Sequence, residues 1–237
     1  MRVIKVSEYN ITAGINAPLV FAFLSDLHEC DTKPVTALLD KYAPDAVLVG
    51  GDYIQSTAAY EKGLAFLSEC AEKYKTFCSL GNHEFKFDGD IRTMTKKTGA
   101  VLLDNEDTEY QGVRIGGLSS GFAYEKQGNL KKTPAPDVEF LKRYSDKDGY
   151  KILLCHHPEY YPEYIKQTDI QLTLSGHAHG GQWRFFGRGV FSPGQGIFPK
   201  YTSGMYDNRL IVSRGLGDSH SMFRINNPFE FIIIRLK

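Results

Sequence analysis

The sequence predicts an α/β fold in which buried strands alternate with amphipathic helices. Five apolar runs rich in β-branched and aromatic residues each end in a polar or glycine-containing cluster, at 19–24, 46–49, 76–80, 151–155 and 170–174. Segments with the apolar spacing of helices lie between several of these runs. Continuous apolar strands of this length are typical of a sheet covered on both faces, and their alternation with helices favours the α/β class.

The expected helices follow one another along the chain. The first begins near Pro34, which suits a first helical turn, and its apolar stripe consists of Val35, Leu38, Leu39 and Tyr42. Three further helices are expected at 60–74, at 88–97 and, after Pro158, at 160–164. They connect the predicted strands in the alternating order of an α/β fold.

The pattern changes after Gly180. Glycine, proline and aromatic residues dominate up to Tyr206, and two more strands are expected at 209–213 and 229–236. The C-terminal part is therefore expected to be richer in strands and loops. Because no segment has the composition of a linker, we expect one domain over residues 1–237.

Composition limits the classes of function. The 237 residues carry 28 Lys and Arg against 28 Asp and Glu, so the net charge is zero and neither nucleic-acid binding nor a nuclease is expected. The four cysteines lack the spacing of a metal site or a disulfide framework, and we expect buried thiols. No signal peptide or membrane-length apolar run is visible. We expect a cytoplasmic protein, or an exported or peripheral membrane protein if a leader was removed.

Acidic, amide and imidazole side chains follow the predicted strands where each strand ends. They are Asp26, His28, Asp52, Asn82, His83, His156, His177 and His179. In open α/β sheets this edge is where ligands bind. At 26–28 and at 177–179, an extended backbone would point residues i and i+2 towards the same ion. Neighbouring glycines allow tight turns and close approach of the backbone.

These side chains offer only oxygen and imidazole as ligands, which favours Mn, Fe or Zn over a soft metal or an iron–sulfur cluster. Asp52 has two carboxylate oxygens and could bridge two ions. Two ions about 3.5–4 Å apart can clamp a phosphate and activate a bridging water to hydroxide. The sequence therefore predicts a binuclear metal site that hydrolyses phosphoesters.

Five motifs resemble those of the calcineurin-like metallophosphoesterases, in the family's order: Asp26-x-His28, Gly51-Asp52, Gly81-Asn82-His83-Glu84, His156-His157-Pro158 and Gly176-His177-Ala178-His179. The later segments 180–182, 198–201, 213–217 and 224–227 resemble a bacterial phosphodiesterase-like branch whose members are often exported or membrane-associated. The resemblance implies a four-layer α/β sandwich, with two mixed β-sheets flanked by helices.

The resemblance also implies a role for each residue. One divalent ion would be held by Asp26, His28 and His179. The second would be held by Asn82, His156 and His177. Asp52 would bridge the two ions, and His83 would lie beside them as the catalytic residue that stabilises the phosphate or protonates the leaving oxygen. The substrate would be a small phosphorylated molecule such as a lipid or nucleotide derivative, and contact with a membrane surface is compatible with the branch.

One departure separates the chain from the protein-phosphatase branch of that family. That branch has a further aspartate after the one that corresponds to Asp52, and this aspartate orients the proton-transferring histidine. Here 53–55 contain no carboxylate. A protein phosphatase is therefore not expected, and Glu84 or Asp88 are candidates to orient His83. The alternative to an enzyme is a non-catalytic module that uses the same fold to bind a partner, but no ligand position is lost.

Several remaining residues have both a functional and a structural interpretation. Arg214 is expected to contact substrate phosphate, whereas Arg184, Arg188 and Lys200 are expected to be solvated loop charges. His157 is expected to support its neighbour without binding metal, Cys30 to be a packed thiol, and His220 to be a surface or substrate-loop residue. We expect the late aromatic residues to pack in folded-back loops in preference to contacting a lipid or a membrane: Trp183, Phe185, Phe186, Phe191, Phe198 and Tyr201.

Overall fold

The computed structural model describes residues 3–119, 125–127, 130–218 and 223–237. Its first six-stranded sheet has the order β1-β18-β2-β3-β4-β5. The bounds of these strands are Ile4–Ile11, Phe229–Leu236, Leu19–Leu24, Ala46–Gly50, Lys75–Ser79 and Val101–Leu102. β18 runs antiparallel to β2, and the other neighbouring strands are parallel. The sheet is therefore mixed, with the C-terminal strand inserted between β1 and β2.

The second six-stranded sheet has the order β16-β17-β11-β10-β7-β6. The bounds of its strands are Gly204–Tyr206, Leu210–Val212, Leu172–Ser175, Tyr150–Cys155, Val113–Leu118 and Glu106–Tyr110. Its outer pairs are antiparallel and its inner pairs parallel. Three small antiparallel ribbons are formed by β8 (Glu125–Gln127) with β9 (Leu130–Lys132), β12 (Arg184–Phe185) with β13 (Arg188–Gly189), and β14 (Phe191–Ser192) with β15 (Gly196–Ile197).

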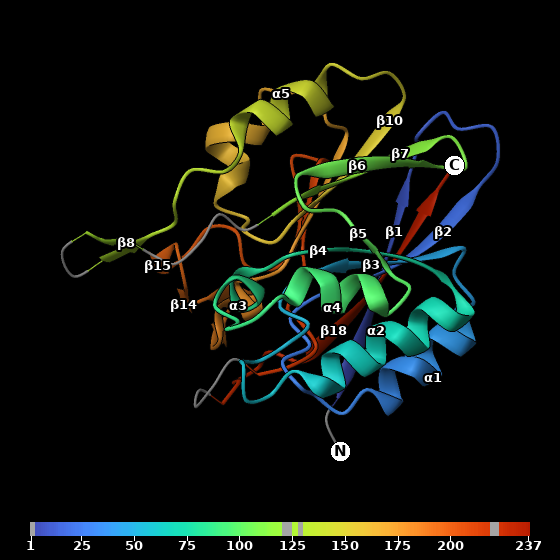
Figure 1. The fold of residues 1–237 in the computed structure, drawn as a ribbon. Helices are drawn as coiled ribbons and strands as arrows, with labels where there is room; N and C mark the ends of the chain where they lie inside the picture. The colour runs from blue at the N-terminus through green and yellow to red at the C-terminus, as the bar shows by residue number, and fades with distance from the viewer. Residues whose placement is uncertain (1–2, 120–124, 128–129, 219–222) are drawn as a thin grey trace.

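Helices cover the outer faces of both sheets (Figure 1). The first sheet is covered by α1 (Lys33–Tyr42), α2 (Glu61–Lys73) and α4 (Ile91–Lys97). The second is covered by α5 (Val138–Ser145) and by the π-helical turn η1 (Tyr161–Ile165). Two short turns follow strand ends, namely α3 (Asn82–Phe85) and the 3-10 turn η2 (His179–Gly181). The order helix, sheet, sheet, helix is the four-layer sandwich that the sequence led us to expect.

The alternation of side chains along β2 explains why four layers form. Phe21 and Phe23 pack in the core between the two sheets, whereas Ala22 and Leu24 pack in the core beneath α1 and α2. A third core under α5 and η1 includes Leu153 of β10. Side chains of a strand point alternately to its two faces, so an uninterrupted apolar run buries both. The prediction that these strands are buried on both faces is confirmed.

The differences from the predicted elements have local causes. The helix expected at 88–97 begins only at Ile91, because the Asp90 side chain accepts a hydrogen bond from the Thr93 amide and caps it. The strands at the N-terminus and at 106–118 were not predicted, and neither was α5. β1 is an edge strand with alternating exposure, so its residues lack an apolar run. In the part of the chain that the structure describes, no helix has the length and apolar character needed to cross a bilayer.

Candidate metal centre

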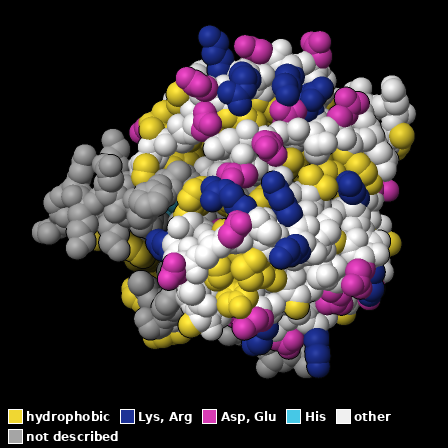
Figure 2. Space-filling model, viewed as in Figure 1, with side chains coloured by type: hydrophobic (Ala, Val, Ile, Leu, Met, Phe, Trp, Pro, Cys, Tyr) yellow, Lys and Arg dark blue, Asp and Glu magenta, His cyan; other side chains and the backbone are white. Residues whose placement is uncertain are grey.

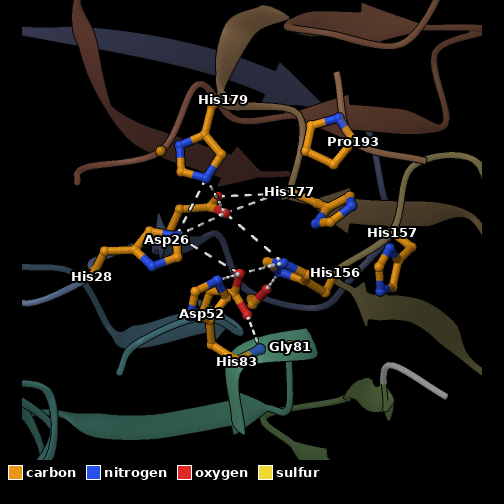
Figure 3. Close-up of polar contacts among 12 residues, drawn as sticks. Asp26, His28, Asp52, Gly81, His83, His156, His157, His177, His179 and Pro193 are labelled. Carbon is orange, nitrogen blue, oxygen red and sulfur yellow. Dashed lines mark hydrogen bonds and ion pairs between the residues drawn. The ribbon is translucent and has the colours of Figure 1, made fainter. Parts of the chain in front are cut away.

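The polar side chains predicted as ligands lie where strands of both sheets end, and those labelled in Figure 3 converge on one centre. Asp26 and His28 follow β2, and Asp52 follows β3. Asn82 and His83 begin α3 after β4, His156 follows β10, and the pair His177 and His179 follows β11. The two sheets pack face to face, so residues far apart in the sequence meet at their common edge.

Three of these residues form a first group. Nε2 of His179 lies 3.3 Å from Oδ1 of Asp26 and 3.2 Å from Nε2 of His28. Nε2 of His28 lies 3.9 Å from Oδ1 of Asp26. All three residues are buried, and their ligand atoms are close enough together to surround one ion.

A second group contains Asp52, His156 and His177, which are also buried. Nε2 of His156 lies 3.1 Å from Oδ2 of Asp52. The same Oδ2 lies 3.7 Å from Nε2 of His28, which belongs to the first group. The Asp52 carboxylate therefore faces a histidine of each group.

The spacing argument for the histidine pair is wrong, because His177 and His179 fall in different groups. It assumed an extended backbone, whereas five of the predicted ligands have positive φ between 42° and 63°: Asp26, His28, Asp52, His177 and His179. A left-handed residue after a strand turns the chain sharply, so residues i and i+2 need not point the same way: Asp26 and His28 share a group, whereas His177 and His179 do not. Such conformations cost about 1–3 kcal/mol each in residues other than glycine and cluster at functional sites.

Two glycines are required by the close approach of the backbone to the carboxylates. A Cβ atom at Gly81 would lie 2.3 Å from Oδ1 of Asp52. A Cβ atom at Gly176 would lie 2.4 Å from Oδ2 of Asp26. Both contacts are far below van der Waals distance, so any side chain here would displace a carboxylate.

Unsatisfied buried atoms indicate that the centre fits metal ions. Oδ1 of Asn82 and Nε2 of His156 are buried and have no hydrogen-bond partner. Nδ1 of His156 lies 2.7 Å from the carbonyl of Gly50. A carbonyl only accepts, so Nδ1 carries a proton and Nε2 faces the centre, which is the orientation that metal-ligating histidines have. The donor set of oxygen and imidazole suits Mn, Fe or Zn.

The electrostatics of the centre favour added positive charge. Burial lowers the pKa of His28 to about 3, and it also lowers the pKa values of His177 and His179 well below their usual range. Burial disfavours the charged form of His156 as well, but Asp52 and Asp26 outweigh it and raise the pKa of His156 to about 10. Most of these imidazoles are thus held neutral, the form that binds metal, around two buried carboxylates.

His83 lies beside the centre and is partly exposed. Its Nε2 lies 3.9 Å from Oδ2 of Asp52, and its Nδ1 lies 2.5 Å from the backbone carbonyl of Gln55. This carbonyl orients the ring, a role for which the sequence had offered Glu84 or Asp88. Glu84 instead accepts hydrogen bonds from the backbone amides of Asp52, Ile54 and Gly81. Backbone groups leave no residue-type signal, so no motif could have revealed Gln55.

Sequence reasoning also missed Glu159, a largely buried carboxylate. Its Oε1 accepts hydrogen bonds from Thr133 at 2.7 Å and from Nδ1 of His157 at 3.1 Å, and lies 4.0 Å from Nε2 of His177. Burial opposes its charged form, but His157 outweighs this and brings the pKa of Glu159 to about 2. Its position next to the motif His156-His157-Pro158 was the available signal.

Arg224 is a second residue that was missed. Its guanidinium lies 3.1 Å from Nδ1 of His179 and donates to the backbone carbonyls of Arg214 and Gly217. The backbone amide of Arg214, the expected phosphate contact, donates to the Glu230 carboxylate. The role of the Arg214 side chain stays a prediction. His220 lies outside the described residues. Cys30 is buried, as expected, in the core beneath α1 and α2.

Comparison with known protein families shows the family to which this chain belongs. The model of the calcineurin-like phosphoesterase family matches residues 19–181, which contain every predicted metal ligand. The chain belongs to this family. Members of the family are hydrolases of phosphoester bonds that use divalent metals, so the class of chemistry follows from the match.

Two bacterial relatives are similar over most of this chain. An uncharacterized metallophosphoesterase of Campylobacter jejuni is 29% identical over 90% of this chain, but the match spans only 56% of that longer protein. Phosphodiesterase YaeI of Escherichia coli is 27% identical over 93% of this chain and 83% of its own length. Among solved structures, sulfate thiohydrolase SoxB of Thermus thermophilus is 14% identical with a TM-score of 0.49, covering 78% of this chain and 36% of SoxB.

Proposed function

We propose that this calcineurin-like phosphoesterase hydrolyses phosphodiesters, and phosphomonoesters less readily, at a binuclear metal centre. Asp26, His28 and His179 would hold one ion, and Asn82, His156 and His177 the other. Bound divalent ions would polarise a phosphoryl oxygen and lower the pKa of a water molecule to near neutrality.

The observation that carries this proposal is the position of Asp52. Its Oδ2 lies 3.1 Å from a histidine of the second group and 3.7 Å from a histidine of the first. A buried carboxylate between two sets of histidines suits a bridge between two cations better than a single mononuclear site. The unpartnered Asn82 Oδ1 would supply a further oxygen ligand, and the amide of the next residue, His83, donates to Oδ1 of Asp52 at 2.8 Å.

His83 is placed to exchange a proton with the substrate. The Gln55 carbonyl accepts from Nδ1–H, so a protonated His83 would also carry a proton on Nε2, on the side that faces Asp52. From there it can donate to the oxygen of the leaving alcohol. The Gln55 carbonyl orients the ring without adding a negative charge, unlike the aspartate of the protein-phosphatase branch. This difference, together with the name of the relative YaeI, supports a phosphodiester over a phosphoprotein.

Hydrolysis of bis(p-nitrophenyl) phosphate with added Mn²⁺ tests the proposal. We expect Asp52→Asn and His156→Ala to abolish turnover, and His83→Gln to lower kcat by about 10²–10⁴-fold while metal content is retained. Glu72→Gln, at an exposed site on α2, serves as the matched control and should leave turnover unchanged. A wild-type protein that is loaded with both ions yet inert towards diesters and monoesters would contradict the proposal and favour a partner-binding module.

A further inference from the structure

Exposed hydrophobic side chains are concentrated in one part of the described chain. Among the residues that the structure describes, seven large hydrophobic ones are exposed, and five of them lie between residues 185 and 223: Phe185, Phe186, Ile197, Phe198 and Phe223. Phe186 is fully exposed, Phe198 77% exposed and Phe223 71% exposed. The prediction that the late aromatic residues pack in folded-back loops is therefore wrong for Phe185, Phe186 and Phe198, although it holds for the buried Tyr201.

Backbone contacts join these residues into one region, which we call the aromatic rim. It comprises the ribbons β12–β13 and β14–β15 with the residues that end them, together with Phe223. The amide of Phe198 donates to the carbonyl of Val190, whose own amide donates to Trp183. The Trp183 indole in turn donates to the carbonyl of Phe223 at 3.0 Å. The rim follows the predicted ligand His179 directly in the chain, through η2.

The rim is a built structure that holds its aromatic residues outward. The buried Arg184 donates to the carbonyl of Gly180 at 2.6 Å, to Thr202 Oγ1 at 3.1 Å and to the carbonyl of Gly187 at the ribbon turn. Phe186 and Phe198 both have a left-handed backbone, with φ of 50° and 52°. Bulky residues rarely adopt this conformation, and strain of this kind is retained where the surrounding structure imposes it.

The charge of the rim differs from that of the rest of the chain. Residues 183–206 contain three basic residues and no Asp or Glu, although the whole chain has equal numbers of both signs. Arg188 and Lys200, which are exposed, each lie two residues after one of the exposed phenylalanines. Across the face drawn in Figure 2, Lys and Arg are interspersed with Asp and Glu between hydrophobic patches. Asp207 lies just beyond residues 183–206, so the excess of positive charge is modest. Exposed aromatic residues beside Arg188 and Lys200 nevertheless complement an anionic bilayer, which accepts rings into its interface and attracts cations.

We propose that the aromatic rim docks this protein on the surface of an anionic phospholipid bilayer. Phe186 and Phe198 enter the interface, and Arg188 and Lys200 bind lipid phosphates. The metal centre then lies next to the bilayer, and its substrate is a phosphodiester carried by a lipid. This last step, but not the docking, rests on the proposed function.

Co-sedimentation with vesicles tests the docking without using catalysis. The wild-type protein is expected to bind mixed phosphatidylcholine–phosphatidylglycerol vesicles, and to bind pure phosphatidylcholine vesicles at least tenfold more weakly. The double variant Phe186→Ser/Phe198→Ser should lower binding to the mixed vesicles by tenfold or more. Arg188→Gln/Lys200→Gln should lower it by about 25-fold, at about fivefold for each charge near the surface, and should remove its salt dependence.

The matched control is Val138→Ser, because Val138 is an exposed apolar residue of α5 outside the rim. This variant should bind the mixed vesicles like the wild type. Equal thermal unfolding of all variants would show that they are folded, as expected for changes at exposed side chains. Docking is overturned if the wild type does not sediment with mixed vesicles, or if the phenylalanine variant binds as well as the wild type. It is also overturned if sedimentation velocity shows a wild-type dimer that the phenylalanine variant dissociates, since the rim would then bind a second copy.

Discussion

Replacing Glu84 should remove the hydrogen bonds that join the turn at Asp52 to the turn at Gly81, and both turns carry predicted metal ligands. Oε2 of Glu84 accepts hydrogen bonds from the amides of Asp52 and Gly81, at 2.8 and 2.7 Å, and Oε1 accepts from the amide of Ile54 at 3.1 Å. Glu84 is buried, so Glu84→Ala leaves three buried amides without an acceptor. At about 1–3 kcal/mol for each unsatisfied group, the free energy of unfolding should fall by about 3–9 kcal/mol.

Glu84→Gln is the graded comparison. An amide oxygen in the place of Oε2 keeps the two bonds from Asp52 and Gly81, whereas the amide nitrogen cannot accept from Ile54. The expected loss is therefore about 1–3 kcal/mol, for one unsatisfied group. Burial, and secondarily Asp52, raise the pKa of Glu84 to about 7, so ionisation of this buried carboxyl lowers the stability of the wild type as the pH rises to about 7. The loss in Glu84→Gln, which carries no charge, should therefore be smaller in alkaline than in acidic buffer.

Urea unfolding in the presence of a chelator measures these losses without a contribution from bound metal. Glu72→Ala, at an exposed site on α2, should change the free energy of unfolding by less than about 0.5 kcal/mol. The reasoning is refuted if Glu84→Ala unfolds within about 1 kcal/mol of the wild type, or if Glu84→Gln is as unstable as Glu84→Ala. Either result would mean that Glu84 does not hold the turns through its two oxygens.

Three further predictions concern the metal centre. Free Mn²⁺ at a hundredfold excess over its Kd should stabilise the fold by about 2.7 kcal/mol, or about 5–10 °C in Tm, and an unchanged Tm in calorimetry would argue against a metal site. Glu159→Gln should weaken Mn²⁺ binding by about 10–100-fold in titration calorimetry, because Glu159 is a negative charge close to His177, while the exposed Glu163→Gln should bind like the wild type; equal affinities would remove Glu159 from this role. Gly176→Ala should reduce both metal content and Tm, because the new Cβ would lie 2.4 Å from Oδ2 of Asp26; a fully metallated variant would show that the turn adapts.

The strands and ligand types were predictable because their signals are local. An apolar run such as 19–24 indicates a doubly buried strand from its own residues, and the polar residues that follow it indicate a ligand-binding edge. The family motifs then assigned the ligands to two ions, and this assignment stays a prediction. In the structure Asp26, His28 and His179 lie together, and so do Asp52, His156 and His177. His83 also lies close to His28 and Asp52, and His157 and Glu159 lie close to His177. Edge strands such as β1 lacked this signal, because their side chains alternate between solvent and core.

By itself, the sequence determined which strands are buried, which side chains meet at their ends and which chemical family they resemble. Only the tertiary structure decided how those side chains are divided between two groups and which neighbouring residues orient them. His28 and His179 are 151 residues apart in the chain yet 3.2 Å apart in space, because the two sheets pack face to face. The support from the Gln55 carbonyl, from Glu159 and from Arg224 also depends on contacts between elements. Spacing cannot reveal such contacts, because left-handed turns set the directions of the side chains after each strand.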